Sequence, residues 1–307
     1  MSGTSDSPRQ TRRAWRKVDG VLLLDKPVGV SSNHALQRAR RLYAAAKAGH
    51  TGTLDPLASG LLPLCFGEAT KFAGELLDAD KRYVARLKLG VTTDTADAEG
   101  AVLAERPVQV DLDRITKVLA EFVGEIDQVP PMFSALKRDG RPLYEYARAG
   151  IELDRAPRRV TIHALTLRAW TDTELEFEVH CSKGTYVRTL GADIGERLGC
   201  GGHLCALRRT AIGALQIADA FTLDQLEGMD DAGRNAALAP PDSLVGTLAV
   251  ARLDEEQARR IRQGQSVAWQ GRAGDRLRLY GPRDGFLGLA RLDGDERLVV
   301  ERLVATQ

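Results

Sequence analysis

The sequence has few cysteines and few aromatic residues, and its net charge is close to zero. Its 307 residues include four cysteines, none in a C-x-x-C pair, and only 5% are aromatic. Unpaired thiols, with no signal peptide or long apolar segment, predict a reduced cytoplasmic protein without a membrane anchor. The net charge of +1 gives no overall nucleic-acid signature, so any basic surface must arise locally. The length predicts about two domains.

Two segments are locally basic. Residues 1–17 carry five basic residues and one acidic residue, a net +4, and their polar composition predicts a disordered arm. Residues 134–168 carry eight basic and four acidic residues, again a net +4, with Tyr144 and Tyr146 among them. Such a patch could bind phosphates and stack bases, although a charged run is more often only a solvated surface.

Hydrophobic periodicity predicts a mixture of strands and helices in the first 246 residues. The strands are continuously apolar or alternate, whereas the helices repeat apolar residues every three to four positions. Ser32 is the expected N-cap of the first helix. The expected elements are strands at 21–24, 83–89 and 175–181, and helices after Ser32, at 111–123 and ending near Gly199.

The chain changes character after Pro240-Pro241, which marks a domain boundary. A short helix from Leu253 to Ile261, with Asp254 as its N-cap, precedes short apolar strands separated by glycine turns. This pattern predicts a small β-barrel. The expected division is a main domain at 18–246 and a C-terminal domain at 247–307.

The loop that begins at Gly49 suits neither a helix nor a strand, because it combines closely spaced glycines with Asp55-Pro56. Pro56 disfavours the helical region for Asp55, and the glycines let another molecule approach the backbone. A carboxylate in such a loop is a candidate site residue. An Asx turn, in which Asp55 only accepts from nearby backbone, accounts for the pattern equally well.

Tyr186 and Arg188 lie where the strand at 175–181 gives way to a helix, a position that often carries site residues. A cation near a helix N-terminus is unfavourable against the helix dipole. Arg188 therefore indicates an anionic partner, although a simple surface charge would also fit.

The sequence predicts no metal site. The polar turn at 93–100 lacks carboxylates at the positions that a calcium loop requires. Cys200, His203 and Cys205 are crowded, have no fourth ligand nearby and match no common zinc spacing. Buried thiols are the expectation there.

Five short motifs lie at separate places along the chain. They are Leu24-Asp25-Lys26-Pro27-x-Gly29, Gly49-His50-Thr51-Gly52-Thr53-Leu54-Asp55-Pro56, Asp80-Lys81-Arg82-Tyr83, Pro131-x-x-Ser134-Ala135-x-Lys137 and Lys183-Gly184-Thr185-Tyr186-Val187-Arg188. In this order they resemble the TruB family of bacterial tRNA pseudouridine-55 synthases. The resemblance implies an α+β catalytic domain with a mixed, largely antiparallel sheet, a thumb inserted at about 130–155, and a small C-terminal β-barrel of the PUA type. One departure is Val300-Glu301, where the family usually has Pro-Arg.

The resemblance also implies an activity and a set of site residues. The activity is isomerisation of the T-loop uridine 55 of tRNA to pseudouridine, in which uracil leaves through N1, rotates and rejoins through C5. Asp55 matches the catalytic aspartate, which either attacks the sugar or removes its C2′ proton, and both routes stay open. Arg188 would pair with Asp55, Tyr83 would stack on the flipped base, and Tyr186 would assist at C5. His50 would fill the space that the base leaves in the T-loop.

Four further residues are implied as substrate-binding, namely Lys26, Pro27, Lys137 and Leu207. The reaction has no redox step, so no cofactor is expected. The implied partner is the T-arm of tRNA, bound without a guide RNA by a monomer. Two alternatives remain: an RNA-binding or tRNA-folding protein in which catalysis is secondary, and the related guide-dependent synthase of archaea and eukaryotes. The thumb segment favours stand-alone action over the latter.

Overall fold

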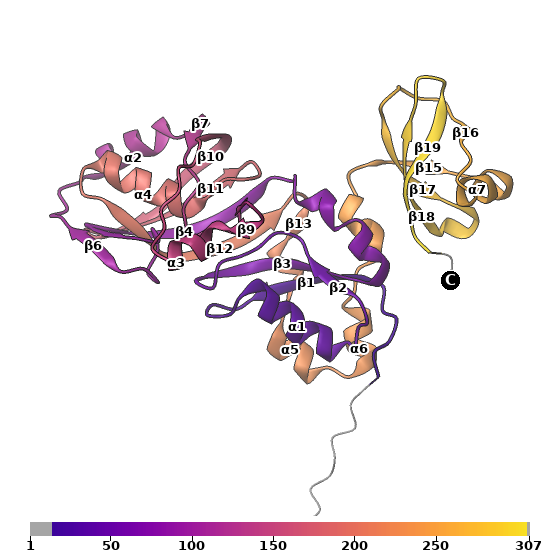
Figure 1. Ribbon diagram of the computed structural model, residues 1–307, viewed down its shortest axis with the longest axis horizontal. Coiled ribbons are helices and arrows are strands. Elements are labelled where there is room, and N and C mark those ends of the chain that lie inside the picture. The colour runs from indigo at the N-terminus through magenta and orange to yellow at the C-terminus, as the bar shows by residue number, and fades with distance from the viewer. Residues whose placement is uncertain (1–13, 306–307) are drawn as a thin grey trace, which may run out of the picture.

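The computed structural model describes residues 14–305 and is organised around one large mixed sheet (Figure 1). The strand order is β14-β1-β3-β12-β4-β11-β10-β7, with β2 beside β3 and β13 beside β12. Within the described residues only the β1/β14 and β12/β3 pairs of this sheet are parallel, so the expected mixed, largely antiparallel sheet is confirmed. The strands are β1 Gly20–Lys26, β2 Ala48–His50, β3 Ala58–Phe66, β4 Lys81–Leu89, β7 Gly124–Gln128, β10 Arg158–Trp170, β11 Glu174–Cys181, β12 Gly202–Ile212, β13 Leu215–Gln216 and β14 Phe221–Thr222.

Alternation along β4 and β11 divides the sheet into a buried and an open face. Tyr83, Ala85, Leu87 and Leu89 are buried, whereas the residues between them are partly or fully exposed. In β11 the three glutamates and His180 lie on the open face, as the sequence pattern predicted. The strand expected at 21–24 is confirmed as part of β1.

Helices cover the buried face. The helix α4 packs on β12 and β4, and α2 packs on α4 and β10, so their apolar residues close the main core. The cap predicted for α1 is wrong by one residue: Ser31 accepts from the His34 N–H, while Ser32 is the first helical residue. No helix among residues 14–305 is long and apolar enough to cross a membrane. The helices are α1 Ser32–Leu42, α2 Leu112–Glu121, α4 Val187–Leu198, α5 Leu223–Gly228 and α6 Asp231–Ala236, with short 3-10 turns η1 Gly67–Lys71, η2 Ala73–Leu76, η3 Ile217–Asp219 and η4 Pro241–Val245.

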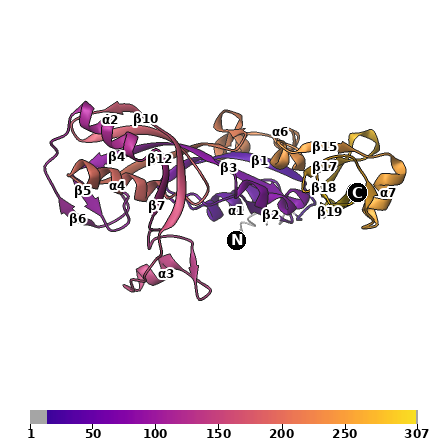
Figure 2. The same cartoon turned by 90° about the horizontal axis from the view of Figure 1, so that it is seen from above.

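Two small hairpins are inserted between the strands of the large sheet. The first, β5 Val91–Thr93 and β6 Val102–Glu105, encloses the polar turn at 93–100. The second, β8 Lys137–Arg138 and β9 Arg141–Pro142, leads into the helix α3 Leu143–Arg148. Figure 2 shows α3 standing away from the sheet, between β7 and β10 in the chain, where the inserted thumb was expected.

The C-terminal segment forms a separate five-stranded sheet in the order β15-β17-β18-β19-β16 (Figure 1). Its helix α7 begins after Asp254, which accepts from the Gln257 N–H in a capping box, as predicted. This curved sheet and its own core fit the expected PUA-like domain. The elements are β15 Ala249–Arg252, α7 Glu255–Arg262, β16 Val267–Ala268, β17 Arg276–Tyr280, η5 Pro282–Asp284, β18 Phe286–Leu292 and β19 Arg297–Leu303.

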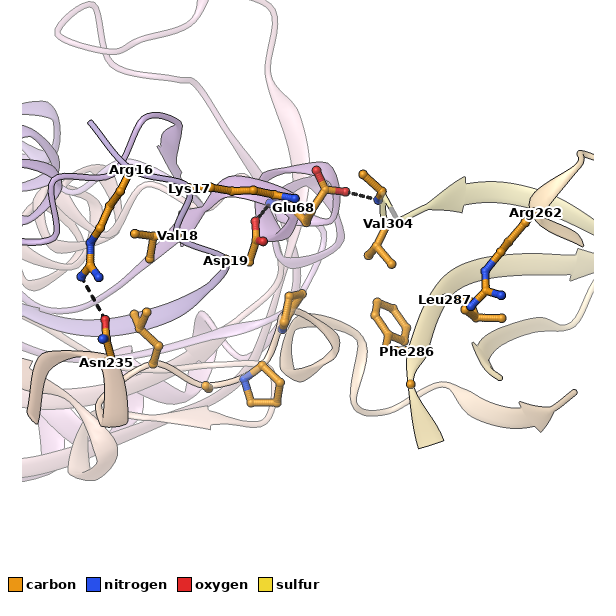
Figure 3. Close-up of a pocket in the computed structure, with 16 residues that line it drawn as sticks. Arg16, Lys17, Val18, Asp19, Glu68, Asn235, Arg262, Phe286, Leu287 and Val304 are labelled. Atoms are coloured by element: carbon orange, nitrogen blue, oxygen red, sulfur yellow. Dashed lines mark hydrogen bonds between the residues drawn. The ribbon is translucent and has the colours of Figure 1, made fainter. Parts of the chain in front are cut away.

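The C-terminal sheet is attached to the main domain by polar contacts with the turns η1 and η2 and by apolar contacts. Arg276 pairs with Glu75 at 2.8 Å, and Lys71 Nζ donates to the Leu303 carbonyl at 2.9 Å. Leu289 packs into an apolar cluster of the main domain. A cavity of about 700 Å³ lies along this contact, but none of the predicted site residues lines it (Figure 3).

Residues 1–13 of the expected N-terminal arm lie outside the described residues. The end of the predicted arm is ordered, because Arg16 exchanges backbone hydrogen bonds with Ala44 and Ala46. Its guanidinium also donates to the Asn235 side chain at 3.0 Å (Figure 3). Arg16, which the sequence placed in the arm, is therefore held against the main domain.

Candidate active site

Five of the nine predicted site residues line one small cavity, with a volume of about 250 Å³. The cavity lies where the Asp55 loop meets β4, β12 and the start of α4. Ser134 and Ala135 of the inserted segment contribute to its wall, so the thumb and the sheet build it together. The five predicted residues are Asp55, Tyr83, Tyr186, Arg188 and Leu207.

The loop that carries Asp55 is fixed through its backbone. The buried Ser32 hydroxyl accepts from the Leu54 N–H at 2.8 Å and is 3.0 Å from the Leu54 carbonyl. The Gly29 N–H donates to the Pro56 carbonyl at 2.8 Å, which holds the far side of the loop. Among residues 14–305 the Asp55 carboxylate has only one ion-pair or hydrogen-bond partner, Arg188. It caps no backbone N–H, so the geometry does not match an Asx turn.

Arg188 has the anionic partner that the sequence indicated, namely Asp55. Its Nε lies 2.8 Å from Asp55 Oδ2 and 3.5 Å from Asp97 Oδ2. The two terminal nitrogens donate to the carbonyls of Thr95 and Phe133, at 2.9 and 2.7 Å. The Arg188 side chain is only 5% exposed, whereas that of Asp55 is 39% exposed. The fixed guanidinium therefore holds a carboxylate that faces the cavity.

Asp97 is a site residue that sequence reasoning missed. Its side chain is only 4% exposed and accepts from Thr95 Oγ1 at 2.6 Å and from the Glu99 N–H at 3.0 Å. The sequence interpretation placed it in a polar turn. Thr93 and Asp97 of this turn are buried, and Asp97 lies beside the buried Arg188.

Tyr83 and Arg209 face each other across β4 and β12. Burial raises the pKa of Tyr83, and the Arg209 guanidinium beside it acts in the opposite direction. Arg209 is almost fully buried, and its Nε donates to the Leu61 carbonyl at 2.8 Å. It lies beside Tyr83 without lining the cavity. No sequence pattern pointed to Arg209, because an arginine in a strand is usually expected to lie at the protein surface.

Tyr186 is held by an amide that was also missed. The Tyr186 N–H donates to Gln128 Oε1 at 2.8 Å, and Gln128 Nε2 donates to the Tyr186 carbonyl at 3.1 Å. Gln128 is 2% exposed and ends β7. This two-way contact fixes the strand-to-helix turn from which Arg188 projects. Burial raises the pKa of the Tyr186 phenol, so the group remains protonated at neutral pH.

The other four predicted residues lie outside the cavity. His50 ends β2, and burial lowers its pKa, so its ring is neutral. Lys26 is fully buried, and its Nζ donates to the carbonyls of Pro27 and Val30 at 2.9 and 2.7 Å. Lys26 thus shapes the turn that displays the exposed Pro27. Lys137 is exposed on the thumb hairpin.

The burial of Lys26 predicts a specific pH dependence of stability. Burial lowers its pKa to about 8, whereas an unfolded lysine titrates near 10.5. Between these values the unfolded chain binds more protons, so the contribution of Lys26 to stability rises with pH, by at most about 3 kcal/mol. We expect the unfolding free energy of the wild type, relative to Lys26→Met, to increase from pH 7 to pH 10 in denaturant titrations. A difference that does not change with pH would contradict this.

Cys200, His203 and Cys205 contact separate backbone groups rather than one another. His203 Nδ1 lies 2.8 Å from the Val91 carbonyl, and the Cys205 thiol lies beside the Arg86 carbonyl. Burial raises the pKa of Cys200, which keeps its thiol protonated. The His and Cys residues of 200–205 therefore take separate structural roles.

Comparison with protein families gives the class of this site. A model described as "TruB family pseudouridylate synthase (N terminal domain)" matches residues 40–187. A model of the tRNA pseudouridylate synthase B C-terminal domain matches residues 188–245, and one described as "Pseudouridine synthase II TruB, C-terminal" matches residues 249–304. The first two matches meet between Val187 and Arg188, inside the site. The class is pseudouridylate synthase.

Curated relatives resemble the chain over its whole length. The tRNA pseudouridine synthase B of Aromatoleum aromaticum is 57% identical over 298 residues, which cover 97% of this chain and 96% of that protein. The protein of the same name from Burkholderia mallei is 56% identical and covers 100% of this chain and 99% of its own length. The chain belongs to the TruB family.

Solved structures support the fold. The chain matches a structure titled "Crystal Structure of a Cbf5-Nop10-Gar1 Complex" with a TM-score of 0.71 and 26% identity, covering 92% of this chain and 84% of that one. An H/ACA RNP bound to a substrate RNA containing 2′-deoxyuridine gives a TM-score of 0.70 at 24% identity, covering 94% and 85%. The second likeness concerns the fold alone.

Proposed function

We propose that this chain converts a uridine of tRNA, the T-loop uridine at position 55, into pseudouridine. The observation that carries the proposal is the ion pair between the buried Arg188 and the cavity-facing Asp55. A carboxylate so paired is held in one orientation toward the cavity, as a nucleophile or base at the sugar must be. The family membership supports the same chemistry.

The cavity suits one extruded base. Its volume of about 250 Å³ is below the roughly 300 Å³ at which pockets for drug-sized ligands begin. Tyr83 and Leu207 line it, so a pyrimidine could be held against a ring and an aliphatic chain. Taking the base out of its stack costs a few kcal/mol, which contacts to the rest of the tRNA can offset.

Asp55 then acts at C1′ or C2′ of the ribose. In one route the carboxylate attacks C1′ as the N1 bond breaks, and in the other it removes the C2′ proton to leave a glycal. In both, the uracil anion turns within the cavity and C5 bonds to C1′. This step breaks the Asp55–C1′ bond in the first route and returns the proton to C2′ in the second, and the C5 proton is then lost while N1 gains one. Tyr186, whose phenol keeps its proton, lies where it could exchange a proton with the base. The residues of the site supply all of these roles without a cofactor.

We further propose that the enzyme works as a cytoplasmic monomer without a guide RNA. The thumb, which carries α3 and the β8/β9 hairpin, gives the chain its own surface for the T-arm. Thumb arginines stack on tyrosines there, with Arg141 over Tyr146 at 4.8 Å and Arg148 over Tyr144 at 5.4 Å. Such pairs can bind phosphates and bases directly.

The test is conversion of an unmodified tRNA transcript by the purified chain alone. We expect pseudouridine at position 55 and at no other uridine, mapped by chemical modification and primer extension. A transcript with cytidine at that position is the matched control and should remain unmodified. Conversion that requires an added RNA, or that occurs at another position, would contradict the proposal.

The C-terminal sheet should contribute affinity for the tRNA backbone. Arg262 on α7 is exposed and has no acidic partner within residues 14–305, whereas Arg259 of the same helix pairs with Glu256 at 2.6 Å. We expect Arg262→Ala to raise KM several-fold, leave kcat unchanged and reduce the slope of log K against log salt by about 1. Arg259→Ala is the control and should change neither. Equal effects of the two substitutions would argue against a phosphate contact.

A further inference from the structure

Three side chains that commonly bind metal ions meet on the open face of the large sheet, away from the catalytic cavity. His163 Nε2 lies 3.1 Å from Asp80 Oδ2, and His180 Nε2 lies 3.9 Å from the same oxygen. The three ligand atoms are all within 4.8 Å of one another. His180 pairs with Arg82 across the strands, whereas Val179 pairs with Tyr83. Neighbouring residues of a strand face opposite sides, so the cluster and Tyr83 lie on opposite faces.

A β-bulge in β10 brings the two histidines together. Ile162 pairs with Cys181 and Ala164 pairs with His180, so His163 is the extra residue between them. Both His163 and the small Ala164 therefore lie opposite His180 on the open face. The two imidazole rings are 4.7 Å apart between centroids. Bulges that re-aim a side chain are specific features of a sheet rather than defects.

The geometry and chemistry of the cluster suit a divalent metal ion. Zinc binds histidine nitrogens and carboxylate oxygens at about 2.0–2.2 Å, which places its ligand atoms roughly 3.0 to 3.6 Å apart. Small side-chain rotations would bring the three atoms to that spacing. Within residues 14–305 neither ring nor the Asp80 carboxylate has another hydrogen-bond partner. The side chains are 26% to 44% exposed, so a metal ion and water can reach them.

We propose that Asp80, His163 and His180 form a zinc site, with water completing the coordination, that stabilises the fold. Asp80 ends the turn that leads into β4, the strand of Tyr83. A second contact holds the same turn: Lys183 Nζ forms an ion pair with Asp78 at 2.8 Å. The ion therefore joins this turn to β10 and β11 without contacting the cavity. The site is separate from the proposed catalytic function and does not take part in it.

The experiment is titration of the full-length, chelator-treated protein with Zn²⁺ and Co²⁺ at neutral pH. We expect one equivalent of Co²⁺ to bind with visible absorption bands, and one equivalent of Zn²⁺ to displace it and raise Tm. His163→Gln and His180→Gln should each weaken binding at least about 100-fold, since even changes behind a ligand cost 10- to 100-fold. His34→Gln on α1 and Cys205→Ser are the matched controls and should bind as the wild type does.

A measurement on the wild type avoids any effect of the substitutions on folding. One equivalent of Zn²⁺ should protect His163 and His180, but not the exposed His34, from modification by diethyl pyrocarbonate mapped by mass spectrometry. Pseudouridine formation should be the same before and after chelation. The proposal is overturned if no equivalent binds, if Cys205→Ser removes it, if the two histidines are not protected, or if chelation abolishes activity that zinc restores.

Discussion

Asp55→Asn should abolish pseudouridine formation while tRNA binding and Tm change little. Asparagine keeps the volume of the side chain but removes the anion that would attack the sugar or take its proton. An interaction used only in the transition state contributes to kcat and not to affinity. We expect a loss of at least about a thousandfold in single-turnover conversion with saturating enzyme.

The matched control is Asp94→Asn in the nearby β5/β6 turn. The Asp94 side chain is exposed and accepts from the Ala101 N–H at 2.8 Å, a role that asparagine can also fill. It should convert tRNA as the wild type does. If Asp55→Asn kept conversion within about tenfold of the wild type, Asp55 would be a structural loop residue and the RNA-binding alternative would gain support.

Much of the fold could be predicted because local patterns were strong. Alternation identified β4 and β11 and their buried faces, and Gly199 ends α4 in a left-handed conformation with φ of 95°, which glycine adopts easily. Asp254 caps α7 because its side chain meets the free N–H groups of the first turn. The cap of α1 was misplaced because Ser31 and Ser32 are adjacent and equally suited. The tertiary contact of Ser32 with Leu54 decided between them.

The site was predicted in part. The motifs include Asp55, Tyr83, Tyr186 and Arg188, which line the cavity, but not the residues that hold these side chains in place. Gln128, Asp97 and Arg209 come from separate segments, and only folding brings them to Tyr186, Arg188 and Tyr83. Within its own segment, each of these three residues looks like an ordinary polar residue, and nothing in the neighbouring sequence indicates its partner. Similarly, Asp80 is more than eighty positions from His163 along the chain, so spacing gave no sign of their contact. The bulge that aligns the histidines depends on strand register, which a single sequence does not determine.

The second large effect is expected at Arg188, where stability and catalysis can be separated. Arg188→Met removes a cation that is almost fully buried and leaves the buried Asp97 carboxylate without a positive charge beside it. Breaking a buried pair on one side costs about 3–5 kcal/mol, so unfolding in denaturant should occur at clearly lower concentration. Conversion should also be lost, because the Asp55 carboxylate would lose the guanidinium that orients it toward the cavity.

Adding Asp97→Asn to Arg188→Met distinguishes a role of Arg188 in stability from a role in catalysis. The double variant replaces the buried Asp97 carboxylate with a neutral amide, so a large part of the lost stability should return. Asp55 still lacks its cation, so conversion should remain below about 1% of the wild type. Arg188→Lys should likewise fail, because a single ammonium cannot reach Asp55, Thr95 and Phe133 at once as the guanidinium does. If activity returned together with stability in the double variant, Arg188 would act only by supporting the fold, and the ion pair with Asp55 would not be part of the reaction.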